Sequence, residues 1–206
     1  MRHFLKRSLS KVGLRVIALV RSAGAPHALE HLRQRLTDAV LHLDDLNEWR
    51  VRKARELGVK VGKDCRLFSM EFSTEPYLIE LGDHVVVSSH TQFITHDGGT
   101  WVFDDLADLP HSMNVYGKIK VGNNVFIGIG CTILCNVAIG DNCVIGAGSV
   151  VRSNIPADSV AFGNPAKVVM ALSLYKKLVT VSDRMMVHDP WDPFKHAAIK
   201  AKFGVS

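Results

Sequence analysis

Three histidines spaced six residues apart, His84, His90 and His96, are the first side chains in this sequence whose type and spacing suggest chemistry. Imidazole is a frequent metal ligand, and its unperturbed pKa of about 6.5 also makes it a proton acceptor at neutral pH. His96 differs from the other two, because a turn-forming Asp-Gly-Gly segment (97–99) follows it and a repeat is interrupted there. His96 is therefore the first candidate for a reactive group.

The interrupted repeat has a period of six residues. From Val121 to Val151 an aliphatic residue occupies every sixth position, and a small or β-branched residue follows each one four positions later. Helices produce spacings of three and four and amphipathic strands a spacing of two, so neither explains the pattern. A period of six is typical of a short strand plus a turn, and three such units close one triangular coil of about 18 residues.

Stacked coils predict a mainly β fold, a parallel β-helix of about four to five coils over residues 59–170. Equivalent residues of successive coils should lie one above another. The expected pairs are Val121 with Ile139, Ile127 with Ile145, and Cys131 with Ser149. The small cysteines are expected as interior packing residues. The register continues upstream, and the excess residues of segment 95–117 predict a long inserted loop, a feature that is often functional.

Two segments flank the predicted coils. Residues 1–58 are predicted to be helical, because apolar residues recur at alternating spacings of three and four. These residues are Leu29, Leu32, Leu36, Ala39, Leu43 and Leu46. In residues 1–22, basic and apolar side chains alternate, which fits either a helix on an anionic membrane surface or a helix docked on the domain. In residues 171–206, Tyr175, Trp191 and Phe194 are expected to cap the last coil.

The charge balance and the cysteines argue against several classes of function. Residues 1–58 contain 12 Lys/Arg against 6 Asp/Glu, whereas residues 59–206 contain 13 against 14, so no nucleic-acid-binding face is expected. The 4 cysteines form no CxxC pair, which disfavours a zinc knuckle and fits reduced thiols in a cytoplasm. No apolar run approaches the roughly 20 residues of a membrane span, and Val16–Val20 is too short for a signal-peptide core.

Two stretches of the repeat region resemble a known family. They are LGDHVVVSSHTQFITHDGG (81–99) and IGDNCVIGAGSVVRSNIPADSVAFGNPAKVV (139–169). Over about residues 58–170 the sequence is similar to the hexapeptide-repeat acyltransferases, most of all to the branch of maltose, galactoside and polysaccharide O-acetyltransferases. The first stretch is the more specific, because it places a histidine where the coil gives way to a loop. The resemblance implies a left-handed β-helix that works as a homotrimer.

The resemblance also implies a reaction, the transfer of an acetyl group from acetyl-CoA to a hydroxyl of a sugar or polysaccharide precursor. His96 matches the family's loop histidine, a general base that takes the proton of the acceptor hydroxyl as it attacks the thioester. His90, Asp97 and Trp101 are the candidates for acceptor binding. His90 stands where the maltose and galactoside branch has an asparagine, which sets this chain apart from that branch.

The family binds the CoA arm in a groove between two subunits, mostly through backbone amides of the last coils. The matching positions are Gly128, Ile129, Gly146, Ala147, Arg152, Ser153, Asn164 and Lys167. Glycine permits close approach of the backbone to a ligand, and Arg152 or Lys167 offers a cation to the CoA phosphates. These positions imply acetyl-CoA in a composite site shared by neighbouring chains of a C3 trimer.

Three other interpretations stay open at this point. An amino-sugar N-acetyltransferase would use the same chemistry on an amine. A zinc enzyme similar to the γ-class carbonic anhydrases would need its histidines to converge, but a spacing of six sends them to three successive faces of one coil, so no metal is expected. A non-catalytic trimeric scaffold is the third. The expected location is the cytoplasm, with peripheral membrane contact through residues 1–22 as an open alternative.

Overall fold

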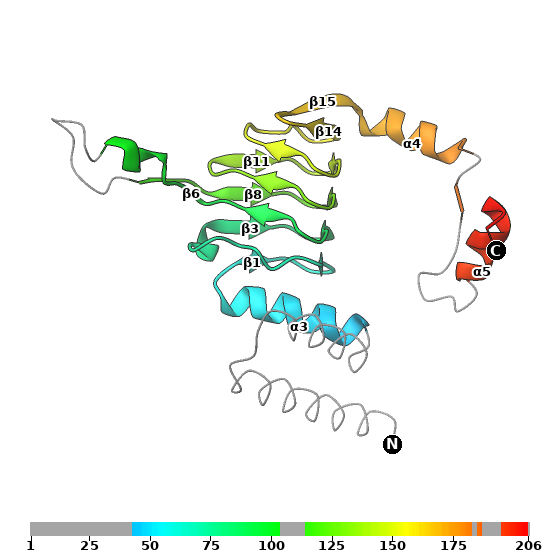
Figure 1. The fold of residues 1–206 in the computed structure, drawn as a ribbon, viewed down its shortest axis with the longest axis horizontal. Coiled ribbons are helices and arrows are strands. Elements are labelled where there is room, and N and C mark those ends of the chain that lie inside the picture. The colour runs from blue at the N-terminus through cyan, green and yellow to red at the C-terminus, as the bar shows by residue number, and fades with distance from the viewer. Residues whose placement is uncertain (1–42, 104–113, 183–184, 187–194, 206) are drawn as a thin grey trace, which may run out of the picture.

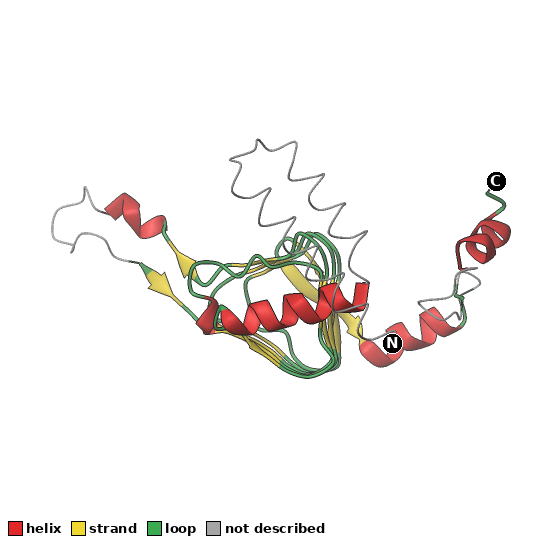
Figure 2. Cartoon of the chain, turned by 90° about the horizontal axis from the view of Figure 1, so that it is seen from below, coloured by secondary structure: helices red, strands yellow, loops and turns green. Residues whose placement is uncertain are grey.

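The strands wind into a parallel β-helix with the shape of a triangular prism (Figures 1 and 2). This computed structural model describes residues 43–103, 114–182, 185–186 and 195–205. The basic segment 1–22, the helical stripe predicted before residue 43, and two expected capping residues, Trp191 and Phe194, lie outside the described residues. The mainly β fold that the period of six predicts is confirmed.

Three parallel sheets form the faces of the prism. Face A contains β1 (Lys60–Val61), β3 (Ile79–Leu81), β8 (Ile119–Val121) and β11 (Val137–Ile139). Face B contains β2 (Arg66–Leu67), β4 (Val85–Val87), β9 (Val125–Ile127), β12 (Val144–Ile145), β14 (Ser159–Gly163) and β15 (Ala166–Ala171). Face C contains β5 (Gln92–Phe93), β10 (Thr132–Ile133) and β13 (Val150–Val151). Within these sheets β15 alone is antiparallel to its neighbour.

The strand register follows the hexads of the sequence. Val121 pairs with Ile139, and Ile127 pairs with Ile145, as predicted. Leu81 pairs with Val121 across the long insertion, so the inserted residues leave the coil without disturbing its register. The described residues complete four coils, and a bridge between Ile139 and Ile155 begins a fifth. The predicted number of coils is confirmed.

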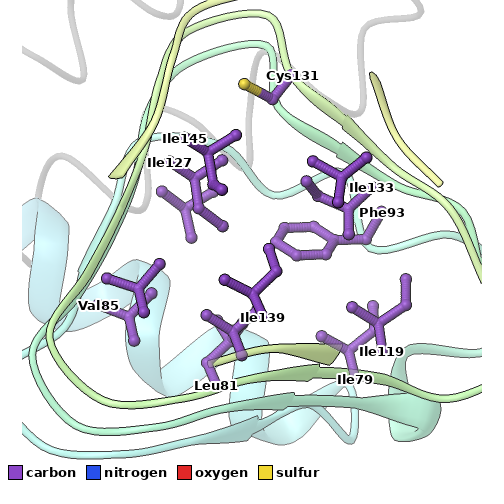
Figure 3. Close-up of a cluster of buried hydrophobic side chains, with 14 of the residues drawn as sticks. Ile79, Leu81, Val85, Phe93, Ile119, Ile127, Cys131, Ile133, Ile139 and Ile145 are labelled. Carbon is purple, nitrogen blue, oxygen red and sulfur yellow. The ribbon is translucent and has the colours of Figure 1, made fainter. Parts of the chain in front are cut away.

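Stacked aliphatic side chains fill the prism (Figure 3). Along each strand of three residues on faces A and B, the first and last side chains point inward and are buried. Phe93 and Ile133 stack on one side of the core, and Ile127 and Ile145 on another. Cys131 is fully buried, in agreement with its predicted packing role. The core is therefore shared between neighbouring coils.

The turns between faces form three edges, which we name after the histidine that each carries in the second coil. The His84 edge joins face A to face B, the His90 edge joins face B to face C, and the His96 edge leads from face C to the next strand of face A. His84 and His90 have φ values of 55° and 58°, the left-handed conformation that makes a sharp turn. The three histidines thus occupy three different edges, as their spacing predicts.

Helix α3 (Leu43–Glu56) covers the first coil, across the end of the prism in Figure 2. Ala54 is buried in the same core cluster as the coil residues, and the partly buried Val51 packs against that cluster. The side-chain amide of Asn47 donates to the Cys65 carbonyl oxygen at 3.0 Å and accepts from the Leu67 N–H at 2.9 Å. The helix therefore satisfies backbone groups that the outermost strand of face B would otherwise leave unpaired.

At the other end of the prism, β15 pairs with β14 and covers its free side. Helix α4 (Leu172–Thr180) continues from β15 with no buried residue, and α5 (Lys195–Phe203) follows. Tyr175, one of the expected capping residues, is 38% exposed, so the cover seen over the last coil comes from β15. Figure 1 shows α4 and strand β6 (His96–Asp97) extending from the prism in opposite directions. None of the described helices has the length and apolar character to cross a membrane.

Candidate active site

The inserted loop leaves the prism at the His96 edge, between the second and third coils. Its base is an antiparallel ribbon of β6 (His96–Asp97) and β7 (Val115–Tyr116), which projects from the prism in Figure 1. A 3-10 helix, η2 (Gly99–Phe103), follows β6. The Gly117 N–H donates to the Thr95 carbonyl oxygen at 2.9 Å and ties the ribbon to the coil. His96 therefore stands on a hydrogen-bonded stem where the loop begins.

The carboxylate of Glu75 orients the imidazole of His96. Glu75 lies on the same edge one coil earlier, in the turn that follows the first coil. His96 Nδ1 is 2.9 Å from Glu75 Oε2, and the two side chains are 34% and 16% exposed. An ionised carboxylate only accepts hydrogen bonds, so Nδ1 carries the proton and Nε2 of the neutral imidazole keeps its lone pair. The tautomer required of a proton acceptor at Nε2 is thereby selected.

Two threonines hold Glu75 in the ionised form. Thr74 Oγ1 donates to Glu75 Oε1 and Thr95 Oγ1 donates to Oε2, each at 2.7 Å. These hydrogen bonds, with a smaller contribution from His96, lower the pKa of Glu75 below its ordinary value. Pro76 begins the short 3-10 helix η1 (Pro76–Leu78), and the Glu75 side chain does not cap that helix. The carboxylate is therefore available to accept hydrogen bonds from the neighbouring coil.

Tyr116 lies beside His96 as its cross-strand partner in the ribbon. The ring centroids of the two residues are 5.9 Å apart and the ring planes are inclined by 47°. Tilted aromatic pairs at this separation are favourable. Because the phenol ring is 54% exposed, Tyr116 both restricts the imidazole and presents an aromatic surface to any molecule that reaches it.

The two remaining candidates in the loop have different surroundings. Asp97 Oδ1 accepts a hydrogen bond from the Gly99 N–H at 2.8 Å, so its carboxylate shapes the turn that opens the loop. Trp101 is 75% exposed on η2. Its indole is therefore not buried within the described part of the chain, and its faces are accessible to a ring-shaped ligand.

His84 belongs to a row of hydrogen-bonded polar side chains along the His84 edge, which we call the polar ladder. His84 Nδ1 is 2.9 Å from Asn124 Oδ1, and Asn124 Nδ2 donates to Asn142 Oδ1 at 2.8 Å. Asn142 Nδ2 in turn donates to Asp158 Oδ1 at 2.9 Å. The four side chains connect successive coils along one edge. His84 thus has a structural role that the repeat itself explains.

Most of the predicted cofactor residues gather on the His90 edge. The register places Gly128 and Ile129 beside Gly146 and Ala147 of the next coil. A Cβ on Gly128 would lie 2.6 Å from the backbone nitrogen of Ala147, so only glycine fits this close approach. Ile129 on this edge is 53% exposed, so the edge is open to solvent there.

The β14–β15 hairpin lies above these residues. Phe162 pairs with Lys167 and Gly163 with Ala166, so a two-residue turn with a cis Asn164–Pro165 bond closes the hairpin. Asn164 and Lys167 are both exposed. His90 lies on the same edge in a lower coil. Gly130 and Gly148, the equivalent residues of the two coils above, also have a positive φ.

Arg152 and Ser153 lie on the His96 edge instead. On face C, Gln92 pairs with Thr132, and Thr132 pairs with Val150. Arg152 comes two residues after Val150, so it lies two coils above the short segment between Gln92 and His96. Both Arg152 and Ser153 are exposed. The eight predicted cofactor residues are therefore divided between two edges of one chain, and two of them share the edge of the candidate base.

Neither the histidines nor the cysteines form a metal site in the part of the chain that the structure describes. The three histidines lie on different edges, and no three His, Cys, Asp or Glu side chains there are arranged to hold an ion. Cys65, Cys131 and Cys143 are buried, and burial raises the pKa of each thiol. These cysteines are therefore placed for packing.

Comparisons with known proteins agree with the repeat geometry. Residues 118–153 match the family model described as bacterial transferase hexapeptide (six repeats). Protein CapG of Staphylococcus aureus is 47% identical over 127 residues, which cover 60% of this chain and 72% of CapG. The chain belongs to the bacterial hexapeptide-repeat transferase family.

Solved structures also align with the chain. A maltose O-acetyltransferase from Clostridium difficile 630 has a TM-score of 0.47 and 24% identity, over 81% of this chain and 88% of the other. A galactoside acetyltransferase in complex with coenzyme A has a TM-score of 0.47 and 26% identity, over 64% of each chain.

Sequence reasoning did not identify Glu75 or Tyr116. No spacing in the sequence pointed to Glu75, because the turn after the first coil has irregular length. The sequence does contain a signal for Glu75: it stands directly before Pro76 and outside the hexad pattern, so its side chain is not needed to fill the core. Tyr116 could be found only by pairing the two ends of the insertion.

Proposed function

We propose that this protein transfers an acetyl group from acetyl-CoA to a hydroxyl of a sugar or polysaccharide precursor. The observation that carries the proposal is the Glu75–His96 pair at the base of the inserted loop, with Nδ1 2.9 Å from Oε2. A partly exposed imidazole with one nitrogen held by a carboxylate is suited to general-base catalysis at the other. Membership of a transferase family fits a group transfer.

His96 Nε2 accepts the proton of the acceptor hydroxyl while the hydroxyl oxygen forms a bond to the thioester carbonyl carbon. Acetyl-CoA supplies an acyl group whose C–S bond breaks with the CoA thiolate as leaving group. The ionised Glu75 stabilises the imidazolium, which then returns the proton to the thiolate. His96 is thus neutral again at the end of each turnover.

The CoA arm is proposed to run along the His90 edge. Gly128 and Gly146 allow successive coils to approach closely at this edge, and Ile129 beside them is 53% exposed. Lys167 at the hairpin and Arg152 on the His96 edge are the cations proposed for the CoA phosphates. Ile129, Ala147, Ser153 and Asn164 would complete the groove.

We propose a C3 trimer in which each site uses two chains. The His96 edge of one chain would face the His90 edge of the next, which unites the two sets of cofactor residues that a single chain keeps apart. Mixing His96→Ala subunits with Ala147→Trp subunits should restore activity in part, because some interfaces would combine two intact halves. Mixed trimers without recovery, despite proven subunit exchange, would contradict the shared site.

The acceptor is proposed to bind at the loop. Trp101 and Tyr116 offer exposed aromatic faces, which stack well on sugar rings. Asp97 shapes the turn that precedes Trp101, and His90 is proposed to contact the acceptor from the neighbouring chain. An amine acceptor would use the same proton transfer, so the product must identify the acceptor atom.

The test is a thioester-cleavage assay with acetyl-CoA and a panel of neutral sugars, nucleotide sugars and oligosaccharides. Release of CoA that depends on an acceptor, with a product whose acetyl group is removed by mild alkali, would support an O-acetyltransferase. An alkali-stable product would instead establish an N-acetyltransferase. If the protein does not bind CoA, the interpretation as a non-catalytic scaffold is favoured. Activity that depends on zinc would contradict the proposed chemistry.

Residues 1–22 are proposed to add peripheral membrane contact to a protein of the cytoplasm. Arg2, Lys6, Arg7, Lys11, Arg15 and Arg21 are interleaved with apolar residues in this segment. Attraction to anionic lipid should weaken as salt increases. Deletion of residues 1–22 should therefore preserve activity and reduce sedimentation with anionic vesicles at low salt. Equal sedimentation of the full-length and truncated proteins would instead support a helix docked on the domain.

A further inference from the structure

Three lysines surround one glutamate on face A, the face between the His96 edge and the His84 edge. Lys60, Glu80 and Lys120 occupy equivalent positions on β1, β3 and β8, so their side chains leave the face side by side. Lys118 precedes β8 and is also exposed. The cluster has three cations for one anion, which makes this part of the surface positive.

The ion pair within the cluster uses only one of the lysines. Lys60 Nζ is 2.8 Å from Glu80 Oε1. The hydrogen bond from Lys60 is the largest cause that lowers the pKa of Glu80, and the charges of Lys120 and Lys118 contribute further. Neither Lys118 nor Lys120 has a carboxylate within ion-pair distance among the described residues. Their charges are therefore available to a ligand.

A shallow groove of about 550 Å³ gives the cluster a binding surface. Lys60, Glu80 and Lys120 line it, together with the backbone at Gly62, Gly82 and Gly122 where the coils turn into the His84 edge. Lys118 does not line the groove; it lies beyond it, toward the His96 edge. A ligand on face A could therefore lie along the strands, with Lys120 inside the groove and Lys118 beside it.

The chain itself connects this groove to the candidate base. Tyr116 is in contact with His96, and the chain runs from Tyr116 through Gly117 directly into β8. Lys118 and Lys120 both point outward because Ile119 between them is buried. An extended chain spans at most about 3.6 Å per residue, so Lys118 and Lys120 lie at most about 7 and 14 Å from Tyr116 along the backbone.

We propose that face A binds an anionic group of the acceptor, through Lys118 and Lys120, while the acceptor's reacting hydroxyl lies at His96. This inference rests on the proposed acetyl transfer and names the class of its substrate: a sugar that carries negative charge beyond the reacting ring. The charge could belong to a carboxylate of an acidic sugar or to the diphosphate of an activated sugar. Both groups are recognised by lysine in the same way.

The experiment measures binding by calorimetry, with trigalacturonic acid, UDP-N-acetylglucosamine and neutral maltotriose as probes. The variant Lys118→Gln/Lys120→Gln removes both free charges, and Lys176→Gln on α4 removes an exposed charge elsewhere. We expect at least one anionic probe to bind the unmodified protein more tightly than maltotriose. Its affinity should fall at least about tenfold in the double variant, through the loss of two charge-assisted contacts, and stay unchanged in Lys176→Gln.

The choice between the two sources follows from which anionic probe responds. Weaker binding of trigalacturonic acid assigns the groove to a carboxylate, and weaker binding of the nucleotide sugar assigns it to a diphosphate. Equal binding by the double variant and the unmodified protein, or no preference for either anion over maltotriose, would overturn the proposal. So would a parallel loss of CoA affinity, because the lysines would then serve the donor.

Failure of the proposed reaction has a separate signature. If the anionic probe binds through the lysines but no acceptor releases CoA from acetyl-CoA, the transferase function fails and the anion site stands. If acetyl transfer proceeds equally in the double variant with charged and neutral acceptors, the anion site fails and the transferase function stands.

Discussion

His84 and His96 lie in the same coil and occupy the same position of the six-residue repeat, but the structure surrounds them differently. On the His84 edge the imidazole is one member of a ladder with Asn124, Asn142 and Asp158, which recurs from coil to coil. On the His96 edge the imidazole faces a carboxylate and a phenol ring at the start of an insertion.

This fold places its stabilising ladder and its candidate catalytic group on different edges. A ladder needs equivalent residues in successive coils, so it occupies an edge whose turns all have the same length. An insertion interrupts the row of equivalent turns, so the histidine at its base needs another partner. Glu75 provides it from the coil below. Chemistry is therefore expected where the repeat is broken and stability where it continues.

The largest effect should come from replacing each histidine in turn. His96→Gln is expected to lower kcat by about 10² to 10⁴, the usual contribution of a general base. His84→Asn should leave kcat unchanged, because asparagine occupies the equivalent position in the coils above and suits the left-handed conformation. Steady-state rates with acetyl-CoA, with thermal unfolding to check the fold, measure both. Equal losses in the two variants would remove the distinction between the edges.

Glu75→Gln should give the next largest effect. The amide can donate to Nδ1, which favours the tautomer with the proton on Nε2 and blocks proton acceptance there. We expect kcat to fall about 10- to 100-fold with little change in the KM for acetyl-CoA. Glu71→Gln is the matched control, because Glu71 is an acid of the same coil that accepts from Gln92 instead. A loss in KM alone would assign Glu75 to binding rather than to orientation of the base.

The pH dependence of the Glu75 contribution follows from its lowered pKa. The carboxylate is ionised above its ordinary value of 4.5 and remains so until the pH falls through its still lower value in the folded protein. The ratio of wild-type to Glu75→Gln rates should therefore be constant across mildly alkaline pH, where an ordinary imidazole is neutral. Rate measurements over that range check this, and a ratio that changes within it would mean that Glu75 is not ionised throughout.

A smaller effect should separate the edges in stability. Asn124→Ala breaks the ladder on both sides and is expected to cost about 1 to 3 kcal/mol of unfolding free energy, with no loss of kcat. Asn136→Ala is the control, since Asn136 has a similar φ of 60° without a ladder hydrogen bond. Urea denaturation of both variants isolates the ladder contribution. If the two variants were equally destabilised, only backbone strain would be involved.

The smallest effect concerns the thiols. Burial raises the pKa of Cys65, Cys131 and Cys143, so the reactive thiolate is scarce at neutral pH. Cys135 is half-buried near the His96 edge. Native protein treated with iodoacetamide should therefore be labelled at Cys135 before the other three, as peptide mass mapping can establish. Rapid labelling of Cys131 would show that the stacked core opens readily.

The sequence predicted the coils well because the period of six is a direct consequence of how the fold packs. Val121 with Ile139 and Ile127 with Ile145 are pairs that any stacking of hexads requires. The place of the insertion followed in the same way, from the excess of residues between Leu81 and Val121. Periodicity therefore gave the core, the edges and the position of His96.

The surroundings of His96 were harder to predict, because they depend on irregular segments. Glu75 lies in a turn whose length the repeat does not determine, and Tyr116 meets His96 only after the insertion returns. The resemblance also did not indicate that the predicted cofactor residues are divided between two edges. Arg152 follows Gly146 closely in sequence, but the turn onto face C carries it to another edge.

The most direct test of the account is chemical rescue at the two histidines. His96→Gly should lose most of its acetyl transfer, and free imidazole added to the assay should restore part of the rate, because it can occupy the vacated space and accept the proton. His84→Gly should keep its activity and show no response to imidazole. Acetyl transfer by His96→Gly at the wild-type rate, or imidazole rescue at both positions alike, would contradict the assignment of His96 as the base.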